Sequence, residues 1–318
     1  MKNTEMMWVN LVHLGANMWN EPGNRKGREN RSTPEASMVL RFNRKLWDDY
    51  MVYMKNAGIN TLVLDIGEAM RYESHPELAV EGSWTHDQMR EELQRLRGMG
   101  FEVIPKLNFS ACHDIWLQEY SRMLSTKPYY AVCRDVINEV LEVFQPKYFH
   151  LGMDEETANN QRNFQHITVR TGELWWHDLY YLVDLVEKGN AQAWVWSDYC
   201  WAKSEEYVKN MPKSVIQNTW YYHNVFDDRA GDFWGPGLRT FEILDKNGFA
   251  QVPAGSNFFE KDNMELLTKY CSENLDSTRI PGYMQTVWEQ IAEGWMDLQY
   301  EAADKLQNAK QWYEANHK

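Results

Sequence analysis

The sequence has 318 residues, of which 43% are hydrophobic and 25% charged, as in a globular protein that buries a sizeable core. Its net charge of −13 argues against nucleic acid or anionic lipid as a partner, because phosphate binding needs clustered Lys and Arg. No apolar run approaches the roughly eighteen residues of a membrane span, and no apolar leader precedes the first predicted strand, so we expect a cytoplasmic protein without membrane contact.

Short apolar runs alternate with amphipathic segments along the whole chain. In the first amphipathic segment Leu46, Trp47, Tyr50 and Met51 follow helical spacing, and Gly58 can end that helix. Strands are predicted over residues 8–14, 61–66, 101–107, 148–151, 191–197, 215–220, 249–252 and 282–287. Helices are predicted over residues 43–57, 86–97, 129–144, 173–187, 204–210, 238–246, 264–274 and 298–315.

Eight strand–helix repeats without a long linker predict an α/β fold, a (β/α)8 TIM barrel, as a single domain over residues 1–318. An open, doubly wound sheet is the alternative, although no glycine fingerprint follows the first strand. The links that follow strands are long, at residues 15–41, 67–85 and 108–128, whereas the helix-to-strand links are short. Long loops at one end of a barrel usually build the binding site.

The most informative stretch is residues 148–156, a short aromatic strand that runs into Gly152 and then into three nearby acids. Barrel folds place their chemistry at the carboxyl ends of their strands, and a charge near a core has to be paired or hydrated. We therefore predict that Asp154 and Glu155 are catalytic. Glu156 is assigned to electrostatic stabilisation of the start of the next helix.

The segment His150-Leu151-Gly152-Met153-Asp154-Glu155 resembles the His-x-Gly-x-Asp-Glu motif of glycoside hydrolase family 20, the β-N-acetylhexosaminidases. Further segments resemble parts of that family's barrel: Ser74 to Leu78 with Trp84-Thr85, Val103 to Asn108 followed by His113, Trp194 to Asp198, and Thr286 to Glu289. The resemblance covers nearly the whole chain. It implies an exo-acting, retaining glycosidase whose substrate is a glycan that contains N-acetylhexosamine.

The family's mechanism is substrate-assisted, because the 2-acetamido oxygen of the sugar attacks the anomeric carbon. The resemblance implies that Asp154 stays ionised and orients the acetamido group. Glu155 would act as general acid and then as general base, with a pKa raised by a tryptophan-lined pocket. We expect the two side chains to diverge from an extended backbone, and His113 to support Glu155 while Asp65 holds the imidazole.

Aromatic side chains at other strand ends are expected to wall the sugar pocket, namely Trp196, Trp220 and Trp288. A tyrosine, either Tyr221 or the slightly favoured Tyr222, would donate to the acetamido carbonyl. Glu289 would reach toward the outer hydroxyls. All of these roles are implied by the resemblance.

Three departures mark a divergent member of the family. The first predicted strand brings no arginine to the sugar hydroxyls, so Arg71, Arg25 or Arg28 are the candidates for that role. The third strand has Lys106 and Asn108 where acids are usual. In addition, Glu289 follows Trp288 directly, where the family inserts one residue.

Two alternatives stay open. The first is a hydrolase of another glycoside with a carboxylate nucleophile, in which Asp65, Glu68 or Glu289 would partner the acid. The second is a carbohydrate-binding barrel without turnover, which would keep the tryptophans. No metal or cofactor is expected, because the four cysteines are scattered and show no metal-type spacing. The choice between gluco and galacto sugars, the linkage and the oligomeric state are left open.

Overall fold

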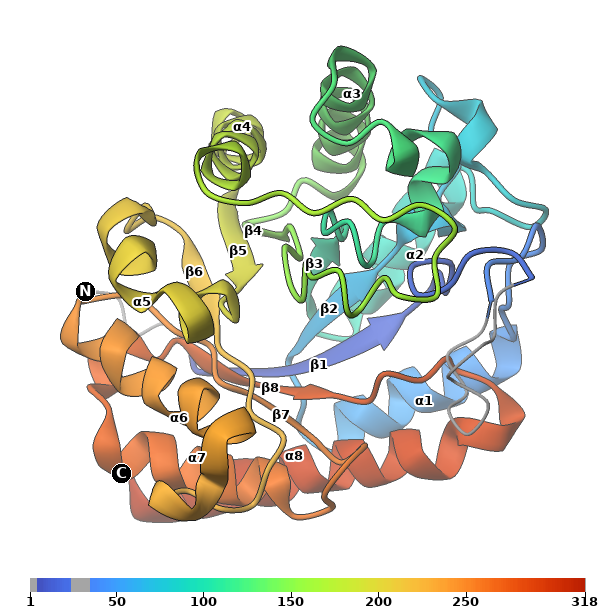
Figure 1. Ribbon diagram of the computed structural model, residues 1–318. Helices are drawn as coiled ribbons and strands as arrows, with labels where there is room; N and C mark the ends of the chain where they lie inside the picture. Colours follow the sequence, from blue (N-terminus) through green and yellow to red (C-terminus); the bar gives the residue numbers. More distant parts are fainter. Residues whose placement is uncertain (1–4, 24–34, 318) are drawn as a thin grey trace.

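A computed structural model describes residues 5–23 and 35–317, in which parallel strands alternate with helices that surround them (Figure 1). The strands are β1 (Met7–His13), β2 (Thr61–Asp65), β3 (Glu102–Lys106), β4 (Tyr148–His150), β5 (Gln192–Trp196), β6 (Ile216–Asn218), β7 (Ala254–Ser256) and β8 (Gly282–Thr286). The helices are α1 (Arg44–Asn56), α2 (His86–Gly98), α3 (Lys127–Phe144), α4 (Glu173–Lys188), α5 (Tyr199–Asn210), α6 (Gly231–Lys246), α7 (Asn263–Asn274) and α8 (Met296–Asn316). None of the helices in the described ranges combines the length and apolarity that a bilayer span requires.

The sheet closes on itself. Its strand order is β6-β5-β4-β3-β2-β1-β8-β7, and all the pairings are parallel. Around the two outer strands, the N–H of Val252 donates to the carbonyl of Gln217, and the N–H of Ala254 donates to that of Thr219, both at 2.8 Å. These bonds join the edges of the sheet, so the predicted (β/α)8 TIM barrel is confirmed and an open sheet is excluded.

The predicted elements are present, with one displaced strand. The seventh strand was expected at residues 249–252, but the ladder with β8 runs over Ala254–Ser256. Alanine, glycine and serine have little intrinsic preference for strands, so this segment is extended because β8 and the β6 segment offer it partners on both sides. The helices α5 and α6 also begin earlier than predicted, at Tyr199 and Gly231.

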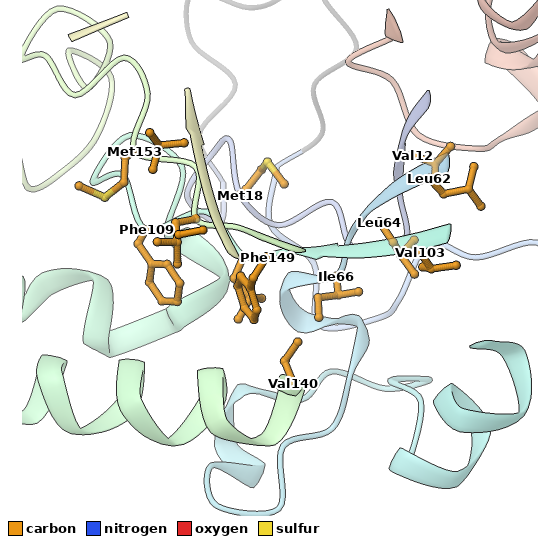
Figure 2. Close-up of a cluster of buried hydrophobic side chains, with 14 of the residues drawn as sticks. Val12, Met18, Leu62, Leu64, Ile66, Val103, Phe109, Val140, Phe149 and Met153 are labelled. Atoms are coloured by element: carbon orange, nitrogen blue, oxygen red, sulfur yellow. The ribbon is translucent and has the colours of Figure 1, made fainter. Parts of the chain in front are cut away.

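Alternate residues of each strand face the helices and the barrel interior. In β2, Leu62 and Leu64 belong to the outer core beneath the helices, whereas Val63 packs in the interior. Figure 2 shows the outer core, where Val140 of α3 lies beneath Phe149 and Ile66. Because the strand period is two, Asp65 shares the interior face with Val63, and this placement decides which partners the aspartate can reach.

Candidate active site

A cavity of about 520 Å3 opens beyond the carboxyl ends of the strands and contains the predicted acids Asp154 and Glu155. His113, in the loop after β3, lines it as well. The predicted aromatic residues that line the cavity are Trp196, Trp220, Tyr222 and Trp288. Most of the predicted site residues, which come from different strands, therefore meet in one place.

The glycine between β4 and the acids is required by two features of the backbone. Gly152 has a φ of 73°, which residues with a side chain rarely adopt. A Cβ at this position would lie 2.8 Å from Cα of Asn108 and closer still to its amide oxygen. The close approach lets the Asn108 amide donate to Oδ1 of Asp154 at 2.8 Å, so Gly152 sets the position of one acid.

Both acids converge on a single imidazole. Nε2 of His113 lies 3.3 Å from Oε2 of Glu155 and 3.5 Å from Oδ2 of Asp154. Burial alone would lower the pKa of His113, but the two neighbouring carboxylates outweigh burial and raise it above its usual value. The expectation of divergent side chains is wrong, because Glu155 has a φ of 55° and is not extended.

The two acids differ in environment. The side chain of Asp154 is 10% exposed and is held by the Asn108 amide, whereas that of Glu155 is 42% exposed. A held carboxylate suits a group that keeps its charge and position. A carboxyl open to the cavity suits a group that exchanges protons with a substrate and with water.

The predicted relay from Asp65 to His113 is not formed. Asp65 is buried in the barrel interior, where Oδ2 lies 2.5 Å from Nζ of Lys106 and 3.5 Å from Nδ1 of His13. Burial would raise the pKa of Asp65, but Lys106 and then His13 outweigh it and lower the pKa. The aspartate therefore balances a buried lysine, a residue that the sequence analysis noted only as a departure from the family.

The two candidate tyrosines face different ways. Tyr222 lines the cavity, and burial raises the pKa of its phenol, which therefore stays protonated and able to donate. Tyr221 instead donates to the carbonyl of Val225 and packs against Phe226, with ring centroids 5.1 Å apart. Glu289 is buried and does not line the cavity.

The arginine candidates do not lie in the described part of this cavity. Arg71 is exposed on the loop after β2 and does not line it, and Arg25 and Arg28 lie outside the described residues. Arg162, in the loop between β4 and α4, does line the cavity and was not predicted.

Glu156 does not stabilise a helix start, because α4 begins only at Glu173. Its carboxylate is buried, pairs with the guanidinium of Arg170 at 2.5 Å and accepts the N–H of Ala111 at 3.0 Å. It therefore ties the loop that carries the acids to the loop after β3. The earlier assignment of Glu156 is wrong, because a loop separates it from the start of α4.

Further residues in and around the cavity were not predicted from the sequence. Asp198 follows β5, and its Oδ2 accepts the backbone N–H of Glu155 at 2.8 Å. It had been noted as part of a strand motif, but without a role. Trp19 and Phe259 also line the cavity from loops, and Phe233 lines it from the first turn of α6. No local motif in the sequence marks these three aromatic residues.

A metal could in principle bind where the acids meet. Within the described chain His113, Asp154 and Glu155 each offer a ligand atom, and these atoms lie within 4.8 Å of one another. His113 is also hydrogen-bonded to Glu155 at 3.3 Å and ion-paired with Asp154 at 3.5 Å, and these contacts account for the cluster as well.

Residues 109–235 match the family model described as glycosyl hydrolase family 20, catalytic domain. The matched segment contains the converging group of His113, Asp154 and Glu155. This segment, less than half of the chain, is similar to the catalytic domain of glycosyl hydrolase family 20. Together with the likeness to solved structures of that family, the match supports a glycosidase.

Solved structures share the same barrel fold with this chain. A β-N-acetylhexosaminidase from Bacteroides fragilis NCTC 9343 has a TM-score of 0.65 at 12% identity, and covers 98% of this chain and 71% of its own. An exo-β-N-acetylglucosaminidase from Vibrio harveyi has a TM-score of 0.63 at 12% identity, with 95% and 54% covered. A chitobiase from Flavobacterium johnsoniae has a TM-score of 0.62 at 16% identity, with 96% and 50% covered.

The chain thus spans between about half and 71% of the length of these proteins. At such identities the likeness concerns the fold. No curated protein sequence matches the chain significantly.

Proposed function

We propose that this chain is a family 20 glycosidase, an exo-acting, retaining β-N-acetylhexosaminidase that uses the 2-acetamido group of its substrate as nucleophile. The observation that carries the proposal is the unequal pair of acids, with Asp154 held and nearly buried and Glu155 open to the cavity. The names of the similar structures, a β-N-acetylhexosaminidase and an exo-β-N-acetylglucosaminidase, agree with this substrate class.

In the first step the acetamido oxygen forms a bond to the anomeric carbon while the bond to the leaving oxygen breaks. Glu155 donates its proton to that leaving oxygen, and Asp154, as an anion, accepts the acetamido N–H and stabilises the positive oxazolinium ring. In the second step water attacks the anomeric carbon, Glu155 accepts a proton from the water, and the ring reopens. Two displacements retain the configuration.

The walls of the cavity suit an acetamido sugar. The Trp196 and Trp288 rings lie 5.7 Å apart between centroids and offer apolar faces to the sugar and its methyl group. Tyr222 has a protonated phenol beside them that can donate to the acetamido carbonyl. His113 touches both acids and can compensate their charge as protons move.

The alternative mechanism, in which a carboxylate of the protein is the nucleophile, has less support. Such an enzyme needs a second carboxylate about 5–5.5 Å from the acid. None of its candidates lines the cavity: Asp65 is paired with Lys106, Glu68 binds backbone amides, and Glu289 is buried.

The test compares aryl glycosides with and without the 2-acetamido group. We expect turnover only when the group is present, tight inhibition by a thiazoline that mimics the oxazoline, and a loss of at least about 100-fold in kcat for Asp154→Asn and for Glu155→Gln. Asp184→Asn, at an exposed carboxylate of α4 that is 54% accessible, is the matched control and should retain full activity.

Turnover of a glucoside that lacks the acetamido group, without thiazoline inhibition, would contradict the proposal. So would binding of N-acetylglucosamine by calorimetry without any hydrolysis, which would favour a carbohydrate-binding barrel.

A further inference from the structure

Asp198 joins two parts of the cavity that come from different strands. It follows β5, and its Oδ2 accepts the backbone N–H of Glu155 at 2.8 Å. Its Oδ1 accepts the indole N–H of Trp220, which follows β6, at 3.3 Å. One carboxylate therefore connects the peptide of one acid to a wall of the cavity.

The peptide that Asp198 holds is strained. Glu155 has a left-handed backbone with a φ of 55°, a conformation that residues with a side chain rarely adopt. A conformation of this kind persists only where the surroundings hold it, and a bond from a carboxylate to a backbone N–H is among the stronger ones. At the other end of the residue, His113 contacts the Glu155 carboxylate.

We propose that Asp198 is a positioning residue for protonation of the leaving group, because it fixes the Glu155 peptide so that the carboxyl points into the cavity. The inference rests on the proposed function, in which Glu155 is the general acid. Asp198 itself touches no reacting atom. Its effect should therefore depend on how much acid assistance a substrate needs.

The charge of Asp198 also favours proton donation by Glu155. The titratable groups around it are Asp154 and Glu155, and His113 contacts both of these. Burial and then the negative charge of Asp154 raise the pKa of Asp198 to about 7. When ionised, Asp198 disfavours a negative charge on its neighbours, which helps Glu155 to keep the proton that it must donate.

The variant Asp198→Asn changes little in volume but breaks this arrangement. Two N–H donors face the side chain, and an asparagine offers only one oxygen to accept them, so its NH2 group must face a donor. Asp198→Glu keeps two acceptor oxygens and moves them by one methylene. Trp220→Phe keeps a ring and leaves the bond to Glu155 in place.

The experiment measures kcat and KM for two aryl N-acetylglucosaminides. One has a dinitrophenyl leaving group, which departs with little acid assistance, and the other an unactivated phenyl group, which needs a proton. For Asp198→Asn we expect kcat to fall at least tenfold on the phenyl substrate and less than threefold on the dinitrophenyl substrate, with KM little changed. Trp220→Phe should show no such dependence on the leaving group.

The pH profile supplies a second readout. With the phenyl substrate, the alkaline limb of kcat should move to lower pH in Asp198→Asn, because an anion beside the general acid has been removed. Equal losses on both substrates, no loss on either, or an unmoved alkaline limb would overturn the proposal. If Asp198→Asn does not fold, as judged by circular dichroism, Asp198→Glu is measured on both substrates and judged by the dependence on the leaving group alone, because it keeps the anion.

Wild-type protein that hydrolyses neither substrate would instead refute the proposed function. The two failures are therefore distinguishable.

Discussion

At the scale of single residues, the candidate site depends on a few positions where the backbone is forced out of its usual conformations. Gly152, Met153 and Glu155 all have positive φ, of 73°, 72° and 55°. Strained backbone of this kind concentrates at functional sites, where the rest of the fold holds it in place. Here it turns two neighbouring carboxylates toward the same histidine.

Gly152 is the position where we expect substitution to be tolerated least. In Gly152→Ala the new Cβ would meet the backbone and the side chain of Asn108, in a conformation that alanine also disfavours. We expect a loss of about 3 kcal/mol or more in the free energy of unfolding, measured by urea denaturation. Because Asn108 must move, kcat should fall as well, through the lost bond to Asp154.

Gly98→Ala is the matched control, since a Cβ there meets nothing within 4 Å. It should leave both stability and kcat close to those of the wild type. A Gly152→Ala variant as stable and active as this control would show that the close approach to Asn108 is not needed.

At the scale of elements, buried carboxylates hold the long loops that follow the strands. Glu156 joins the loop after β4 to the loop after β3 through Arg170 and Ala111. Glu68, in the turn after β2, plays a similar part: its Oε1 accepts the N–H groups of Ala16 and Asn17 at 2.8 and 3.0 Å. The loop after β1, which contains Ala16 and Asn17, then brings Met18 and Trp19 to the cavity.

Glu68 should make the stability of the protein depend on pH. Burial raises its pKa from 4.5 to about 7, so the folded state binds the proton more tightly than the unfolded chain. The stabilisation is complete below pH 4.5 and is lost as the pH rises toward 7. In Glu68→Gln we expect the fall in unfolding free energy between pH 5 and pH 8 to be smaller by about 2–3 kcal/mol.

The measurement is urea denaturation at both pH values. Glu91→Gln, at an exposed glutamate of α2, is the control and should keep the pH dependence of the wild type. An unchanged pH dependence in Glu68→Gln would contradict the role of burial at this residue.

At the scale of the whole molecule, the barrel encloses charge as well as apolar side chains. The eight-stranded barrel has an interior in which Lys106 is fully buried and paired with Asp65, with His13 alongside. A buried ion pair is weak evidence for stability, but removing one partner leaves an uncompensated charge. The pair therefore constrains which substitutions the interior can accept.

A double-mutant cycle tests this constraint. Asp65→Asn and Lys106→Met should each lower the free energy of unfolding by about 3–5 kcal/mol, since each leaves a charge alone in the interior. The double variant should lose clearly less than the two single losses together, with a coupling of at least about 1 kcal/mol in chemical denaturation. Additive losses would show that the two residues do not stabilise each other.

The predicted features that the structure contains share a common property. The periodicity of strands and helices, the glycine and adjacent acids after β4, and the tryptophans at strand ends are each encoded in a few contiguous residues. The TIM barrel could therefore be predicted, as could the acids and the tryptophans gathered in the cavity. The displaced β7 shows the limit, because a segment of small residues becomes a strand only when its neighbours pair with it.

The sequence by itself determined the succession of elements and the chemical groups that stand at the strand ends, because hydrophobic period and local motif act over short stretches of chain. Only the tertiary structure decided that Asp65 pairs with Lys106, that Tyr222 and not Tyr221 faces the cavity, and that Asp198 holds the peptide of Glu155. These partners are far apart in sequence. They meet because barrel closure and the conformations of the long loops bring them together. Local sequence patterns predict neither the closure nor the loop conformations.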